Sequence, residues 1–404
     1  MYARSLPLDV SMPPTVPALA PARAAKALNV LMVSETWPPE INGVALTVAA
    51  LARGLASEGH QVRVVRPAQP AGLEPEPLPG VRELPVPGAR LPRYAALRFG
   101  FPAQRRLRAE FARERPDALY VATEGPLGWS AVSAARAMGI PVATGFHTRF
   151  DDFVGHYGLG FLRSTAFAYL RRFHNRAATT LVPTEALQAE LQTGGFRDVR
   201  ILARGVDADL FHPARRSLAL RAAWGVPPDA LALLFVGRIA PEKNLDLVLA
   251  TVAAIQASGI PARMIWVGDG PSRAALQQQY PEHVWCGMQR GEALAEHYAS
   301  ADLFLFPSLT ETFGNVTLEA LASGLPTIAF DYGAAGRHID DGVNGCAVRY
   351  ADSDAYVKRA VALAHDAAAR RKMALAARAS AEQLTTTAVS ARFADLLRQL
   401  ESPR

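Results

Sequence analysis

The chain has 404 residues, of which 50% are hydrophobic and 20% are charged, and it contains two cysteines. This length favours two or three domains, and the composition excludes an intrinsically disordered chain. A single distant pair of cysteines excludes a disulfide framework and a cysteine-based zinc site. We therefore expect Cys286 and Cys346 to be free thiols in a reducing cytoplasm.

The N-terminal segment, residues 1–27, is rich in proline and alanine. It has no unbroken apolar run long enough for the core of a signal peptide, so we interpret it as a flexible leader. No other segment approaches the roughly 18 to 20 apolar residues that a membrane-spanning helix needs. Any association with a membrane is therefore expected to be peripheral.

The formal charge of +6 is unevenly distributed. Residues 1–204 hold 24 Lys and Arg against 16 Asp and Glu, whereas residues 205–404 hold 19 against 21. Residues 90–115 alone carry eight arginines among several aromatic residues. This pattern indicates attraction to an anionic membrane surface or an anionic acceptor, and the alternative is a set of ordinary solvated helix faces. Nucleic acid is not an expected partner, because no nucleic-acid-binding module can be recognised.

From Asn29 onward, short runs rich in valine, leucine and isoleucine alternate with turns and longer amphipathic stretches, which is typical of parallel α/β folding. In the first half we predict strands at 30–33, 62–65, 118–122, 142–145 and 180–182, and helices at 45–57, 103–114, 129–138, 162–176 and 185–192. In the second half we predict strands at 231–236, 263–267, 284–286, 303–306 and 327–330, and helices at 244–256, 272–279, 291–299 and 316–322.

A polar connector at residues 204–213 separates these two series. It predicts two Rossmann-like domains, at 28–204 and at 205–387. A last helical stretch within 388–404 is expected to cross back onto the first domain. Because open parallel sheets bind ligands at the carboxyl ends of their strands, we expect a donor and an acceptor to meet in the cleft between the domains.

Two glutamates, Glu311 and Glu319, flank the junction between the predicted strand at 303–306 and the helix at 316–322. The free N–H groups and the positive end of the helix dipole at this junction favour a phosphate or a polyhydroxyl ligand. Carboxylates suit sugars because their oxygens accept hydrogen bonds from neighbouring hydroxyls. The alternative is one solvated glutamate and one ordinary helix glutamate.

Two cations follow the first strand of the second series, Arg238 in a Gly-Arg turn and Lys243 at a helix start. They would lie beside the Glu311 loop, where two fixed positive charges could neutralise a diphosphate as a binding group and a leaving group.

The order of these motifs, Gly-Arg-x4-Lys, Val-Gly-x-Gly, Pro-Ser-x2-Glu-x-Phe-Gly and Glu-x7-Glu, resembles the retaining glycosyltransferases of the GT-B fold, specifically glycosyltransferase family 4. The resemblance extends over residues 28 to about 390. In the first half it includes Trp37-Pro-Pro39 with Asn42-Gly43, and Gly145-Phe146-His147. These loops are most similar to the bacterial mannosyltransferases and glycolipid synthases.

The resemblance implies that residues 28–204 form an acceptor domain and residues 205–387 a nucleotide-sugar donor domain, and it implies a role for each matching residue. Arg238 and Lys243 would hold the donor diphosphate, Glu319 the ribose, and Glu311 the donor sugar; His147 would face the reacting carbon from the opposite domain. The remaining donor-binding residues that it implies are Gly43, Met288, Phe313, Gly314, Asn315 and Val316. Arg204 stands where many relatives have asparagine, which leaves the contact made at this edge of the linker open.

The expected reaction is a retaining, metal-independent transfer of a hexosyl group to a lipid or glycan acceptor. GDP-mannose is the favoured donor, and a UDP-sugar-dependent glycolipid synthase is the alternative. We expect the same-face route, in which the leaving phosphate helps to deprotonate the acceptor. Two Asp-x-Asp sequences, at Asp207 and Asp352, are interpreted as chance matches to a metal motif.

Other classes fit less well. A nicotinamide oxidoreductase would need a third glycine where Arg273 stands. An epimerase or a phosphorylase could share the architecture, since fold does not fix function. A non-catalytic sugar-nucleotide binding protein is disfavoured because every expected charged residue is present. His156, His174 and His297 are interpreted as surface or structural, and Asp151, Asp152 and Tyr157 as part of an acceptor loop.

Overall fold

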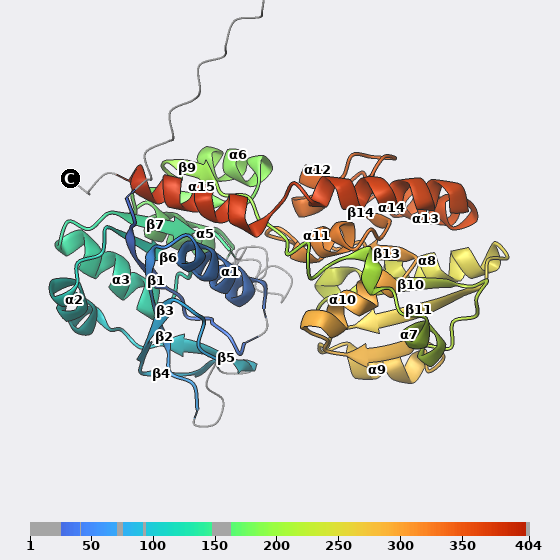
Figure 1. Cartoon of the computed structure of the whole chain (residues 1–404), viewed down its shortest axis with the longest axis horizontal. Helices are drawn as coiled ribbons and strands as arrows, with labels where there is room; N and C mark the ends of the chain where they lie inside the picture. Colours follow the sequence, from blue (N-terminus) through green and yellow to red (C-terminus); the bar gives the residue numbers. More distant parts are fainter. Residues whose placement is uncertain (1–25, 41, 71–75, 92–93, 148–162, 401–404) are drawn as a thin grey trace, which may run out of the picture.

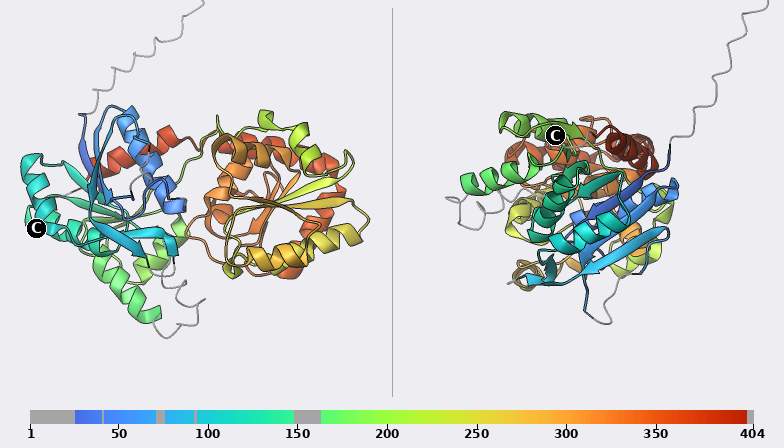
Figure 2. Two further views of the ribbon diagram at one scale, coloured as in Figure 1. Left: turned by 90° about the horizontal axis from the view of Figure 1, so that it is seen from below. Right: turned by 90° about the vertical axis from the view of Figure 1, so that its left-hand side faces the viewer.

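A computed structural model describes residues 26–40, 42–70, 76–91, 94–147 and 163–400 of the chain. Most of the predicted leader and all of the predicted acceptor loop around Asp151, Asp152 and Tyr157 lie outside these ranges. The described residues form two α/β bodies that lie side by side (Figure 1), and Figure 2 shows the same division from below.

The first body is built on a parallel sheet in the order β3-β2-β1-β6-β7-β8-β9. Its strands are β1 Asn29–Val33, β2 Gln61–Pro67, β3 Val81–Val86, β6 Ala118–Val121, β7 Val142–Gly145, β8 Thr179–Val182 and β9 Val199–Ile201, and β4 Gly88–Leu91 pairs with β5 Tyr94–Gly100 in a separate antiparallel hairpin. Its helices are α1 Gly43–Ser57, α2 Gln104–Arg113, α3 Pro126–Ala137, α5 Arg163–His174 and α6 Glu185–Thr193.

The second body is built on a parallel sheet in the order β12-β11-β10-β13-β14-β15. Its strands are β10 Leu231–Val236, β11 Ala262–Val267, β12 Val284–Gly287, β13 Leu303–Phe306, β14 Thr327–Phe330 and β15 Cys346–Val348. Its helices are α7 Leu218–Ala223, α8 Leu245–Ala257, α9 Arg273–Gln279, α10 Gly291–Ser300, α11 Asn315–Ala322, α12 Gly333–His338, α13 Ser353–His365 and α14 Ala367–Ala381, and short 3-10 turns lie at η2 Pro213–Arg215 and η3 Pro241–Lys243.

Helices cover both faces of the first sheet. Successive side chains of its central strand point to opposite sides and therefore pack against different helices. Val30 and Met32 of β1 pack with α1, whereas Leu31 and Val33 pack with α2 and α3. A continuous apolar run is therefore what a fully covered parallel strand requires.

The sequence did not reveal β3, β9, β15 or the β4-β5 hairpin. β3 is an edge strand that pairs with β2 alone, and it carries Arg82, Glu83 and Pro85, which are tolerated there because one side of an edge strand needs no ladder partner. β9 and β15 have three residues each, too few for a periodic signal.

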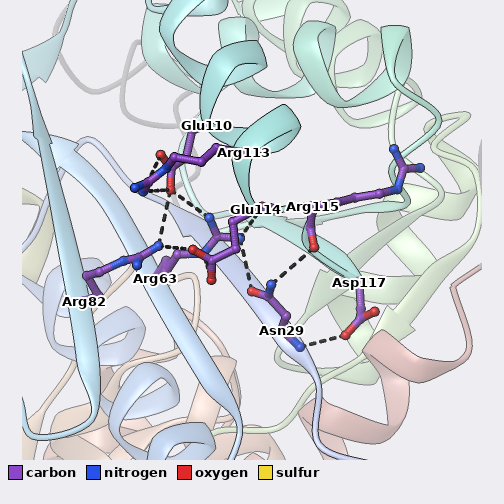
Figure 3. Close-up of polar contacts among 8 residues, drawn as sticks. All are labelled: Asn29, Arg63, Arg82, Glu110, Arg113, Glu114, Arg115 and Asp117. Carbon is purple, nitrogen blue, oxygen red and sulfur yellow. Dashed lines mark hydrogen bonds and ion pairs between the residues drawn. The ribbon is translucent and has the colours of Figure 1, made fainter.

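An ion-pair network fixes α2 against this edge of the sheet (Figure 3). Arg63 of β2 is buried and donates to Glu110 at 2.8 Å and to the backbone carbonyl of Glu114 at 2.8 Å. Arg82 of β3 contacts the same two glutamates, and Arg113 pairs with Glu110 at 3.0 Å. Part of the positive charge counted in the sequence is thus neutralised inside the molecule.

The chain crosses between the two bodies twice, and the two crossings lie together. After β9 it passes to the second body, and it returns through α15, Thr386–Arg398. Val206 and Thr385 form a β-bridge where the crossings meet. In Figure 1, α15 lies over α1, and its apolar side, with Phe393, Leu396 and Leu397, is buried in the core that also contains β1.

The buried ring of Phe393 provides a test of this docking. It is fully buried and meets the ring of Tyr120 edge to face at 4.9 Å between centroids. We expect Phe393→Ala to lower the free energy of unfolding by about 3 to 5 kcal/mol, because the lost contacts leave a cavity. Chemical denaturation measures the change, and the exposed neighbour Arg392→Ala is the control. Equal stability of both variants would contradict the docking of α15.

Candidate active site at the carboxyl edges of the two sheets

The junction between β13 and α11 has the predicted form of strand, loop and helix. Gly314 adopts φ of 92°, a left-handed conformation that glycine accepts without strain, and α11 begins at the next residue, Asn315. Glu311 lies in the loop and Glu319 in the second turn of the helix. Phe313, which follows the loop glutamate, is buried, whereas Val316 packs at the border of the core.

Lys243 and Glu311 form an ion pair at the edge of the second sheet. The Lys243 Nζ lies 2.5 Å from Glu311 Oε1, and the two side chains are 15% and 16% exposed. Lys243 Nζ also contacts Thr310 O at 3.3 Å and Ser308 Oγ at 3.4 Å. The pairing follows from the topology, because β10 and β13 are hydrogen-bonded neighbours and these two loops leave the same edge.

Arg238 lies in the loop after β10 and pairs with Glu242 at 3.3 Å. Its side chain is 38% exposed, more than twice the exposure of Lys243. The more accessible of the two cations thus pairs with a carboxylate four residues later in the chain, in η3.

The two glycines of Val267-Gly268-Asp269-Gly270 support the loop that carries Arg238. A Cβ on Gly268 would lie 1.9 Å from Gly237 O, and one on Gly270 would lie 2.3 Å from Ile239 O. Ile239 N donates to Asp269 O at 2.9 Å across the same contact. These glycines therefore allow two neighbouring loops to approach closely.

Glu319 is held by a tyrosine and protonates unusually easily. Tyr298 donates its hydroxyl to Glu319 Oε2 at 2.9 Å. Burial is the main cause that raises the pKa of Glu319 from 4.5 to about 7, and the bond from Tyr298 opposes it. A group at this position can exchange between acceptor-only and donor forms near neutral pH.

In the first body, His147 follows β7, and both of its ring nitrogens are engaged. Nε2 lies 2.6 Å from the Tyr120 hydroxyl, and Nδ1 lies 2.9 Å from Nη2 of Arg204. Gly145 leaves the space for this pair, since a Cβ there would lie 2.2 Å from the Tyr120 hydroxyl. The ring therefore has a fixed orientation.

Gly43 is the first residue of α1, and its N-cap is Asn42. The Asn42 Oδ1 accepts from Val44 N at 3.1 Å and from Ala45 N at 2.9 Å. The structure describes no atom within 4 Å of a Cβ built on Gly43, apart from its immediate surroundings in the chain. This helix start is thus open to a neighbouring group.

Two cavities border the β13-α11 junction. The larger one, of about 660 Å³, runs between the bodies and is lined by His147, Arg204, Asn315 and Glu319, among others. The smaller one, of about 340 Å³, is lined by Glu311 together with α6 and the start of α12. The junction therefore faces both.

The structure does not bring all predicted site residues to these cavities. Of the predicted residues, these do not line either cavity: Gly43, Arg238, Lys243, Met288, Phe313, Gly314 and Val316. Met288 is 48% exposed, and the residues after it, Gln289 and Arg290, line the larger cavity in its place. The larger cavity extends instead toward the linker, α1 and α15.

Sequence reasoning missed a buried carboxylate in the first body. Glu35 follows β1 and accepts from Leu127 N of α3 at 2.8 Å, and burial raises its pKa to about 7. The available signal was a charged residue two positions after a buried strand. His174, which we interpreted as surface or structural, is buried, with Nδ1 2.8 Å from Thr144 Oγ1 and Nε2 3.3 Å from Glu124 Oε1.

The two Asp-x-Asp sequences serve local backbone structure. Asp207 Oδ1 accepts from Leu210 N at 2.9 Å, and Asp352 Oδ1 accepts from Ala355 N at 3.0 Å at the start of α13. Among the residues that the structure describes, no group of three or more His, Cys, Asp and Glu side chains could hold a metal ion.

Comparison with known proteins assigns the family. Residues 41–210 match the model of Glycosyltransferase Family 4, and residues 230–366 match that of Glycosyl transferases group 1. A GDP-mannose-dependent alpha-mannosyltransferase of Mycobacterium tuberculosis is 38% identical over 309 residues, which are 76% of this chain and 80% of the relative. The chain belongs to glycosyltransferase family 4. The predicted family and the predicted enzyme class, a hexosyltransferase, are confirmed.

More distant relatives share the architecture. A sulfoquinovosyl transferase of Arabidopsis thaliana is 28% identical over 91% of this chain and 72% of its own. The crystal structure of Anabaena HepE with UDP and glucose superimposes with a TM-score of 0.72 at 19% identity, covering 92% of this chain and 100% of that one. The predicted GT-B fold of this glycosyltransferase is thereby confirmed.

The raised pKa of Glu319 generates a prediction about stability. Between pH 4.5 and about 7 the folded chain holds a proton that the unfolded chain releases, so the free energy of unfolding falls as the pH rises through this window. We expect Glu319→Gln, which carries no charge, to stabilise the protein more at pH 8 than at pH 5, by on the order of 1 to 3 kcal/mol.

Urea denaturation at both pH values measures this difference. Glu292→Gln is the control, because that side chain is 82% exposed. If Glu319→Gln changed stability equally at pH 5 and pH 8, its carboxyl would titrate as an ordinary exposed group.

Proposed function

We propose that this glycosyltransferase moves a mannosyl group from GDP-mannose to a hydroxyl of a lipid, lipid-linked or glycan acceptor, with retention of the anomeric configuration. The observation that carries the proposal is the 38% identity, over most of both chains, to an enzyme named as a GDP-mannose-dependent alpha-mannosyltransferase. The arrangement of charges at the edge of the second sheet supports a diphosphate donor.

In this proposal the second body holds the donor. Arg238 and Lys243 bind the diphosphate, Glu319 binds the ribose, and Glu311 binds sugar hydroxyls. The backbone amides of Phe313, Gly314 and Asn315 at the start of α11 add to the grip on the sugar, with Val316 beside them and Met288 near the base. Because Lys243 is already paired with Glu311 at 2.5 Å, the donor must exchange partners with both.

The first body supplies the opposite side of the site. Gly43, open at the N-terminus of α1, allows close approach to the phosphates, and His147 faces the donor sugar. The nearby carboxylates are engaged, Glu311 by Lys243 and Glu319 by Tyr298. This supports a same-face transfer in which the departing diphosphate helps to deprotonate the acceptor, and the protein contributes orientation and charge stabilisation.

In this scheme the cations of the protein and the helix amides neutralise the diphosphate, as a metal ion does in other glycosyltransferases. We therefore propose that transfer needs no metal cofactor.

A lipid acceptor at the inner face of the cytoplasmic membrane fits the charge of the first body. Arg105, Arg106 and Arg108 of α2 are exposed, and Phe101 beside them is 45% exposed. Arg113 and Arg115 contribute less, because Arg113 pairs with Glu110 and Arg115 donates to the carbonyls of Met138 and Gly139. No described helix is long and apolar enough to cross a membrane. We propose peripheral contact with anionic lipid through this part of α2.

A UDP-sugar donor is the second candidate. It is supported by the glucosyl product named for a more distant relative, an alpha-monoglucosyldiacylglycerol synthase of Streptococcus pneumoniae at 26% identity. An epimerase on the same fold would convert the donor without any acceptor.

Transfer assays with a panel of donors test the proposal. Purified protein is incubated with membrane lipid extract and GDP-mannose, UDP-glucose, UDP-N-acetylglucosamine or UDP-glucuronate, and the anomeric configuration of the product is determined by NMR. We expect an α-linked mannolipid from GDP-mannose, at a rate that EDTA leaves unchanged. Product from UDP-sugars but not from GDP-mannose would contradict the proposed donor. Conversion of the donor without an acceptor would contradict a transfer reaction, and loss of activity in EDTA would contradict metal independence.

The two cations give a mutational test. We expect Arg238→Ala and Lys243→Ala to lower turnover by on the order of 100-fold while the fold persists, since each removes a charge that stabilises the leaving diphosphate. Initial rates at saturating donor measure this loss, and Arg371→Ala, an exposed arginine on α14, is the control. Rates of either variant within about tenfold of the wild type would refute its role.

A further inference from the structure

Arg204 is a buried arginine at the start of the crossing between the two bodies. Its side chain is 8% exposed, and it contacts groups from three different segments. It donates to Thr47 Oγ1 of α1 and to His147 Nδ1 at 2.9 Å, and its guanidinium lies 5.8 Å from the centre of the Phe313 ring. Among the described residues, no carboxylate lies within ion-pair distance of Arg204. Its described partners are a hydroxyl, an imidazole and an aromatic ring.

The hydrogen bonds around Arg204 leave one arrangement of protons. A guanidinium has only donors, so the Nδ1 of His147 must present a lone pair. The neutral imidazole then carries its hydrogen on Nε2, which lies 2.6 Å from the Tyr120 oxygen and donates to it. The Tyr120 hydroxyl hydrogen is consequently directed away from His147, and both Tyr120 and His147 line the larger cavity.

We infer that Arg204 is the positioning residue of His147: it holds the imidazole neutral, as the Nε2–H tautomer, in a fixed orientation on the side of the cleft opposite the donor domain. This inference rests on the proposed role of His147 in facing the donor sugar. It assigns to Arg204 a function that the resemblance to the family left open.

The charged and titratable groups around the ring agree with this assignment. Arg204 faces His147 from the linker, Tyr120 from β6, and His174 from α5, where His174 is itself paired with Glu124. Burial is the largest cause that lowers the pKa of His147 far below 6.5, and the charge of Arg204 and then His174 lower it further. Burial lowers the pKa of Arg204 to about 10, so the guanidinium remains charged at neutral pH.

The other contacts of Arg204 connect the ring to the donor elements of both bodies. Thr47 is one turn after Gly43 in α1, and its hydroxyl donates to Gly43 O at 2.6 Å. Phe313 belongs to the loop between Glu311 and α11 in the second body. Arg204 thus sets His147 relative to both loops that the proposal places around the donor.

Nitrogen NMR of histidine tests the inference without any assay of activity. In protein labelled with ¹⁵N-histidine, His147 is assigned by the signal that disappears in His147→Ala. We expect its Nδ1 to show the unprotonated shift and its Nε2 the protonated shift from pH 6 to pH 8. In Arg204→Gln, which removes the charge, the ring should become protonated at higher pH than in the wild type. A protonated Nδ1 in the wild type, or a titration that Arg204→Gln leaves unchanged, would overturn the inference.

Kinetics then separate positioning from direct donor binding. We expect Arg204→Gln to lower kcat by on the order of 10 to 100-fold with a smaller change in the donor KM, and to move the acidic limb of the kcat/KM profile to higher pH. Arg204→Lys keeps the charge and should move this limb less. Arg200→Gln is the control, since Arg200 is on β9 and pairs with Asp198.

A rise in donor KM with an unmoved acidic limb would show that Arg204 binds the donor directly, which would overturn the inference. Failure of the proposed donor has a different signature: no variant or wild type would use GDP-mannose, whereas the NMR result would be unaffected.

Discussion

All candidate chemistry in this chain depends on one geometric constraint: parallel strands end at the same edge of their sheet. β10 and β13 are neighbours, so the loops after them bring Lys243 and Glu311 together from positions 68 residues apart. In the first body, β6 and β7 bring Tyr120 to His147 in the same way. Arg238 and Lys243 lie in the second body and His147 in the first, so in the proposed function the site is complete only where the two bodies face each other.

The second feature of the site is that its charges are already paired. Lys243 forms an ion pair with Glu311, and Arg238 forms one with Glu242. In the proposed function, a diphosphate sugar replaces these partners and gains less net affinity than the number of its contacts suggests. Such exchange suits an enzyme that must release the diphosphate as product, because interactions that strengthen as the bond breaks accelerate the reaction more than tight ground-state binding does.

The sequence predicted the central strands and the β13-α11 junction well, because fully covered strands are long apolar runs and Gly314 marks the turn. It missed β3, β9 and β15, whose short or mixed sequences depend on neighbouring strands that only the tertiary structure supplies. The ion pair of Lys243 with Glu311 and the contact of Arg204 with His147 were also out of reach. Each joins loops that are 57 or more residues apart, and pattern reasoning fixes the edge of the sheet but not which side chains touch there.

A crystal structure of the protein with GDP-mannose would show directly how the donor binds. We expect diphosphate oxygens within hydrogen-bond distance of Arg238 and Lys243, ribose hydroxyls on Glu319, and the mannose between Glu311 and His147. A nucleotide bound with its diphosphate away from both cations, or a sugar directed away from the first body, would contradict it.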